Sequence, residues 1–286
     1  MSAYVNLTEG TVHDLGDGHK MVRFENFLPE SDFNTLATHN FNTESVTSAA
    51  YSHDYKVPLF RYFHNSTLRD STYAHQLTLK QARIDEELDE FKTRDDSKYR
   101  AEPSAYNPDC YLSAPDDIAL IIQNVYADNF LKSYLENNLG NGDITSSNAH
   151  LKVYQKVTSM PEGVDYVPMG IQTLKSSALS SPEVKYHGMI MLRDPAQPSS
   201  EGGGAYNFFH LEHDTNNNKY PITQDPEISG NDGEVDQNGV FKVQVAYESN
   251  VGIFYTNTEG LFKMQHGWQT SDYQYRQMRL KYMGSA

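Results

Sequence analysis

The N-terminal part of the chain alternates between strand spacing and helix spacing. The segment "HKMVRFENFLPESDFNTLATHNF" predicts a short strand at Met21–Phe24, followed by a helix that begins near Pro29. That helix would present Phe33, Leu36 and Ala37 on one face. We therefore expect an amphipathic helix that packs on a sheet.

The clearest helical pattern is "PDDIALIIQNVYADNFLKSYLENNLG", which predicts one helix from about Asp116 to Leu139, ended by Gly140. Its apolar positions form one broad face, made of Ile118, Ile121, Ile122, Val125, Phe130, Leu131 and Leu135. A face of this width is typical of a helix that covers a sheet.

From His150 onward the chain changes to short runs rich in Val, Ile, Tyr and Phe, separated by Gly, Pro, Asn and Ser. This spacing is typical of a β-barrel or jelly roll. The sequence therefore predicts an α+β protein that is mainly β, as a single domain over residues 1–286. Its helical layer would span about 20–140 and its β core about 150–282.

Composition restricts the partners more than the fold. The formal net charge is −15, which disfavours nucleic acid and membrane surfaces as partners. A single cysteine, Cys110, excludes an internal disulfide and a cysteine-rich zinc site. The first residues have neither the basic segment nor the apolar run of a signal peptide, so we expect a cytoplasmic or virion protein. The 20 tyrosines and the Asn-, Gly- and Asp-rich loops suggest a protein partner or an assembly.

Near the C-terminus, strand periodicity places one histidine and one arginine on the same side of their strands as apolar residues. In "LFKMQHGWQ", His266 shares one side with Phe262, Met264 and Trp268. In "YRQMRLKYM", the alternation predicts that one face is buried, made of Arg276, Met278, Leu280 and Tyr282, and that the other tilts to solvent, made of Gln277, Arg279 and Lys281. A buried guanidinium requires a partner anion, either a structural carboxylate or the carboxylate of a bound small molecule.

Four segments, in chain order, resemble the 2-oxoglutarate and Fe(II) dependent oxygenases, especially their prolyl-hydroxylase-like branch. These are "VRFENFLPESDFNTL", "LKVYQKV", "MIMLRDPAQPSSEGGGAYNFF" and "VQVAYESNVGIFYTNTEGLFKMQHGW". The resemblance implies a double-stranded β-helix, which is a cupin-like jelly roll. It also implies an iron held by two histidines and one carboxylate, with open positions for 2-oxoglutarate and oxygen.

When the family's site residues are matched to this sequence one by one, His266 matches the distal iron ligand. Arg276 matches the basic residue that holds 2-oxoglutarate. The family's His-x-Asp should lie on the second core strand, where this chain has "YVPMGIQTL". Gly170 and Gln172 would then occupy the positions of His and Asp. A glycine has no ligating side chain and a glutamine amide is neutral, so we predict a vestigial site without Fe(II) or 2-oxoglutarate.

Other readings of the metal site and of the function stay open. His210 is the one histidine followed two residues later by a carboxylate, Glu212, but it comes after the Gly-Gly turn, two strands too late. His187 lies nearer the expected place and has no such carboxylate.

We expect a non-catalytic binding or assembly protein, with a compositional resemblance to structural proteins of bacterial viruses. The alternative is an active dioxygenase that hydroxylates a peptidyl or small-molecule substrate. A carbohydrate-binding jelly roll is disfavoured by the inward side predicted for Trp268.

Overall fold

The structure, a computed structural model, describes part of the chain: residues 2–16, 18–41, 59–72, 74, 109–154, 171–173, 183–198, 206–211, 239–245, 247–257, 261–265 and 272–285. The helices are α1 (Glu30–Thr38), α4 (Asp116–Ala127) and α5 (Asn129–Leu139). The strands are β1 (Gly10–Gly16), β2 (His19–Phe24), β3 (Leu59–Phe63), β4 (Asp109–Ser113), β5 (Ser146–Tyr154), β6 (Ile171–Thr173), β7 (Glu183–Leu192), β8 (Tyr206–Leu211), β9 (Gly239–Val245), β10 (Ser249–Thr256), β11 (Leu261–Gln265) and β12 (Arg276–Gly284).

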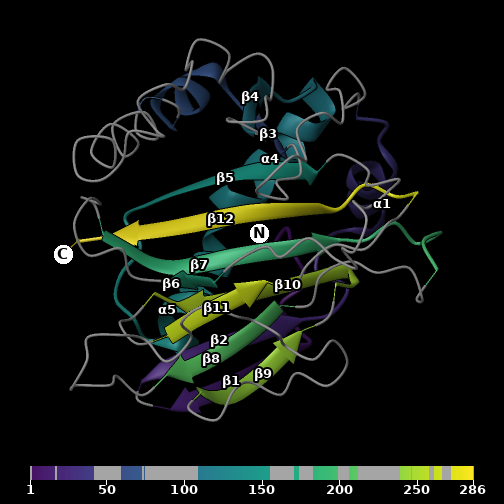
Figure 1. The fold of residues 1–286 in the computed structure, drawn as a ribbon. Coiled ribbons are helices and arrows are strands. Elements are labelled where there is room, and N and C mark those ends of the chain that lie inside the picture. Colours follow the sequence, from purple (N-terminus) through teal and green to yellow (C-terminus); the bar gives the residue numbers. More distant parts are fainter. Residues whose placement is uncertain are drawn as a thin grey trace, which may run out of the picture.

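The strands form a larger and a smaller sheet (Figure 1). The eight-stranded sheet has the order β1-β2-β10-β7-β12-β5-β3-β4, and the four-stranded sheet has the order β6-β11-β8-β9. Strands β3 and β4 are parallel, whereas the other described pairs are antiparallel. In Figure 1, α4 and α5 lie behind the larger sheet, and the smaller sheet is drawn in front of it. The predicted combination of helices with a larger β part is confirmed, and the larger sheet is mostly antiparallel.

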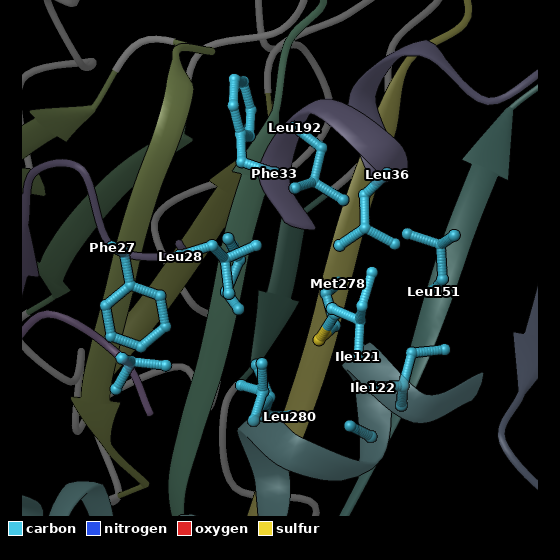
Figure 2. Packing of buried hydrophobic residues seen from close by; sticks show 14 of the residues in the cluster. Phe27, Leu28, Phe33, Leu36, Ile121, Ile122, Leu151, Leu192, Met278 and Leu280 are labelled. Atoms are coloured by element: carbon cyan, nitrogen blue, oxygen red, sulfur yellow. The ribbon is translucent and has the colours of Figure 1, made fainter. Parts of the chain in front are cut away.

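The helices cover one face of the larger sheet. Side chains from α1 and α4 meet residues of β5, β7 and β12 in an apolar core (Figure 2), including Leu36, Ile121, Ile122, Leu151, Leu192, Met278 and Leu280. All seven are fully buried or nearly so. Each large apolar side chain buried in this way contributes about 1.5–3 kcal/mol relative to an exposed one. The predicted burial of Phe33, Leu36 and Ala37 in α1 is confirmed.

The predicted single helix from Asp116 to Leu139 is wrong, because the chain breaks at Asp128 into α4 and α5. Asp128 has an extended backbone, and its Oδ1 accepts from the N–H of Phe130 at 2.8 Å. Its Oδ2 accepts from the N–H of Tyr4 at 2.7 Å. The break changes the helical phase, so Phe130 is 47% exposed rather than buried as predicted. No helix in the described ranges is long and apolar enough to span a membrane.

We expect Asp128→Ala to lower the free energy of unfolding by about 2 kcal/mol, because it removes a helix N-cap and leaves backbone N–H groups of the N-terminal segment without their acceptor. Asp128 itself is 92% buried, its exposed fraction being 8%. Urea unfolding monitored by circular dichroism measures the change. Asp128→Asn keeps one acceptor oxygen and should lose less than half as much stability. Equal losses in the two variants would contradict the role of this side chain as a cap.

Candidate functional site

Strands β6 and β11 bring together the two segments from which the resemblance takes iron ligands. Ile171 pairs with Met264, and Gln172 pairs with Lys263. The strands are antiparallel, so the chain enters β6 and leaves β11 at the same end of this ribbon. Gly170 immediately precedes β6 and His266 immediately follows β11; both lie outside the described residues, and Gln172 is described by its backbone alone.

The alternative pair is His210 and Glu212, of which His210 lies on β8 beside the beginning of β11. His210 lies on β8 opposite Leu261, whereas Gln265 lies opposite Tyr206. Four residues therefore separate these two registers, or about 13 Å at the rise of a strand. Metal–ligand bonds are about 2 Å long, so His210 and a residue directly after Gln265 are poorly placed to share an ion. Glu212 itself lies outside the described residues.

Arg276 is buried, as the alternation predicted, with 7% of its surface exposed. Its Nη1 donates to the carbonyl oxygens of Leu36, at 2.9 Å, and Ala37, both near the C-terminal end of α1. Its Nη2 donates to Oε1 of Gln274 at 2.9 Å. The side chain thus lies on the helix-covered face of the sheet, together with Met278 and Leu280.

The sequence suggested a carboxylate as the partner of Arg276, either from the protein or from a bound small molecule, and the observed partners are of another kind. Instead of a carboxylate, the guanidinium meets the carbonyl end of α1, where the helix dipole places partial negative charge. It also lies 5.2 Å from the centre of the Phe41 ring. Burial lowers the pKa of Arg276. Its role in binding 2-oxoglutarate stays a prediction.

The opposite face of β12 corrects the sequence analysis. Gln277, Arg279 and Lys281 were expected to tilt to solvent, yet Gln277 is fully buried and Arg279 is half-buried; Lys281 is exposed. Gln277 lies between Lys152 of β5 and Met191 of β7 in the register, so side chains of both neighbouring strands flank it on this face.

This second face carries a set of basic side chains that sequence reasoning missed as a group. We call it the basic face, and its members are Arg61, His150, Lys152, His187, Arg279 and Lys281. They come from four strands that are neighbours in the sheet, β3, β5, β12 and β7. The available signal was the pair of basic residues at alternate positions in β5 and in β12, but only the register shows that Arg61 and His187 share their face.

Across the ranges that the structure describes, no group of three or more His, Cys, Asp or Glu side chains is arranged to hold a metal ion. The segments that contain Gly170, Glu212 and His266 are outside those ranges.

No protein-family profile matches the sequence, and no curated protein matches it. Comparison with solved structures finds similarity to the crystal structure of a Pseudomonas putida prolyl-4-hydroxylase, with 8% sequence identity and a TM-score of 0.33. The match covers 59% of this chain and 65% of that chain, which is less than two thirds of the hydroxylase. The finding is a distant structural similarity to a prolyl-4-hydroxylase.

Proposed function

We propose that this chain is a double-stranded β-helix of the 2-oxoglutarate oxygenase type that serves as a non-catalytic binding or assembly protein. The observation that carries this proposal is the β6–β11 pairing. It sets Ile171 and Gln172 beside the chain that leads to His266, in the segment where the family would have its His-x-Asp.

The order of the strands supports the fold part of the proposal. A jelly roll divides eight strands between two facing sheets. From β5 onward, the chain contributes β5, β7, β10 and β12 to the larger sheet and β6, β8, β9 and β11 to the smaller one. Each sheet therefore receives four of these eight strands, and the chain changes sheet at most steps, as in a double-stranded β-helix.

The ligand count supports the loss of catalysis. A facial triad holds Fe(II) through three side-chain donors and leaves three positions open. Gly170 offers no donor, and Gln172 offers a neutral amide in place of a carboxylate. His266 would remain as a single imidazole, which is too few protein ligands to retain Fe(II).

An anaerobic titration with Fe(II) and 2-oxoglutarate tests the proposal. We expect no stoichiometric iron binding, no visible metal-to-ligand charge-transfer band and, after oxygen is admitted, no succinate. The double variant Gly170→His with Gln172→Asp supplies the two missing donors and should gain iron affinity that His266→Ala removes again.

A band at one iron per chain in the unmodified protein, abolished by His266→Ala, would overturn the proposal and favour an active dioxygenase. Glu212→Ala would then show whether the second histidine segment takes part. If the unmodified protein lacks iron, an assembly role like that of a bacterial-virus structural protein predicts a defined oligomer or a protein partner. Light scattering of the purified chain measures the oligomer directly.

A further inference from the structure

Residues 4–8, which we call the strap, precede β1 and belong to no helix or strand. The backbone N–H groups of Tyr4 and Val5 donate to Oδ2 of Asp128, at 2.7 and 3.3 Å. The hydroxyl of Tyr4 donates to Oδ2 of Asp32, in the first turn of α1. Burial, and then the neighbouring Asp32, raise the pKa of Tyr4, so this hydroxyl stays protonated and donates. The strap therefore connects α1 to the junction between α4 and α5.

The strap also packs against the apolar core. Val5 is 4% exposed and belongs to the core cluster, whereas Tyr4 and Leu7 are half-buried and pack against that cluster. The N–H of Asn6 donates to the carbonyl oxygen of Phe27 at 2.8 Å, shortly before α1 begins. A segment that lies outside regular structure and has one fully buried side chain is among the parts of a fold that open most easily.

Helix α1 depends on contacts at both of its ends. It has nine residues, and a helix this short is marginally stable by itself. Pro29, which precedes its first turn, provides no side-chain cap. The first turn is instead held from outside through the contact between Tyr4 and Asp32, and the last turn through Arg276.

The last turn of α1 and the chain that follows it cover the guanidinium of Arg276. The carbonyl oxygens of Leu36 and Ala37 accept from this guanidinium, and the ring of Phe41 lies 5.2 Å from it. Because helix opening is cooperative, weaker contacts at the first turn raise the population in which the last turn is also open. The strap and Arg276 therefore act on the same short helix from opposite ends.

We propose that the strap is a conformational lock on α1. While the strap is docked, α1 stays closed over Arg276; when the strap is released, α1 opens and the guanidinium becomes accessible. Coupling of this kind is reciprocal, so loss of the Arg276 contacts loosens the strap as well. The lock goes beyond the proposed binding or assembly role, and it involves none of the positions from which the resemblance takes iron ligands.

Hydrogen exchange followed by mass spectrometry measures the opening of α1. Tyr4→Phe keeps the ring but removes the hydroxyl that contacts Asp32. We expect the amides of α1 to exchange about tenfold faster in this variant, and the amides of the central strand β7 to exchange at an unchanged rate. Tyr126→Phe is the matched control, because it removes a tyrosine hydroxyl that contacts His64 rather than α1. It should leave the exchange of α1 unchanged.

Phenylglyoxal, which modifies accessible guanidinium groups, measures the exposure of Arg276. We expect Arg276 to react about tenfold faster in Tyr4→Phe than in the unmodified protein, in step with the opening of α1. Arg69 is half-buried outside this region and serves as the internal reference, with equal rates in both proteins. In the reciprocal experiment, Arg276→Lys should accelerate the exchange of the Asn6 N–H more than that of β7.

Equal exchange of α1 in the unmodified protein and in Tyr4→Phe would overturn the proposal. An equal acceleration of α1 and β7 would do the same, because it would reduce the strap to a general contribution to stability. Faster exchange of α1 with an unchanged modification rate of Arg276 would also contradict the lock, since α1 would then not control access to the guanidinium. The iron titration can succeed or fail independently, because the lock uses no iron ligand.

Discussion

Arg276→Met is expected to lower the free energy of unfolding by about 4 kcal/mol, which would be among the largest effects of a single substitution in this chain. Methionine keeps much of the volume but leaves the carbonyls of Leu36 and Ala37 and the amide oxygen of Gln274 without their donors. Each buried acceptor that loses its partner costs about 1–3 kcal/mol. Denaturant unfolding at equilibrium measures the loss.

Arg276→Lys separates charge from geometry. A lysine restores the positive charge near the end of α1, but one ammonium cannot reproduce the forked donation to α1 and Gln274, so we expect about half of the loss to remain. Unchanged stability in Arg276→Met would show that α1 does not depend on this side chain. Adding 2-oxoglutarate tests whether Arg276 binds this ligand. If it does, 2-oxoglutarate should raise the unfolding midpoint of the unmodified protein but not that of Arg276→Lys.

Asn250→Ala is expected to cost about 4 kcal/mol as well, for a different reason. Asn250 is the extra residue of a bulge in β10, and its φ of 56° is in the left-handed region. Its Oδ1 accepts from the N–H of Leu28 at 2.8 Å, and its Nδ2 donates to the carbonyl of Leu28 at 2.9 Å. The side chain thus ties the segment before α1 to the sheet, and it is 7% exposed.

Asn250→Gly is the matched control, because glycine adopts the left-handed conformation freely but offers no side-chain hydrogen bonds. It should be about 1 kcal/mol more stable than Asn250→Ala and remain well below the unmodified protein. Thermal unfolding with circular dichroism gives both values. If Asn250→Gly matched the unmodified protein, backbone conformation alone would account for this position, and the two bonds to Leu28 would contribute nothing measurable.

Local patterns predicted local structure well. The spacing of Phe33, Leu36 and Ala37 was sufficient for α1, and the alternation in β12 correctly predicted that Arg276 is buried. The same alternation failed for Gln277, which is fully buried, because the pattern assumes that the face opposite the helices is free. The helical pattern missed the break at Asp128 because its cause includes a contact with Tyr4, 124 residues away.

The sequence by itself determined the position of α1, the mainly β character of the C-terminal half, and the burial of Arg276 on β12, since these depend on neighbours along the chain. Only the tertiary structure decided that α1 supplies two partners of Arg276, that Ile171 and Gln172 pair with the strand before His266, and that six basic residues share one face. The physical reason is that strand order and register bring together residues far apart in sequence, and a shift of one residue would move every side chain of a strand to the other face.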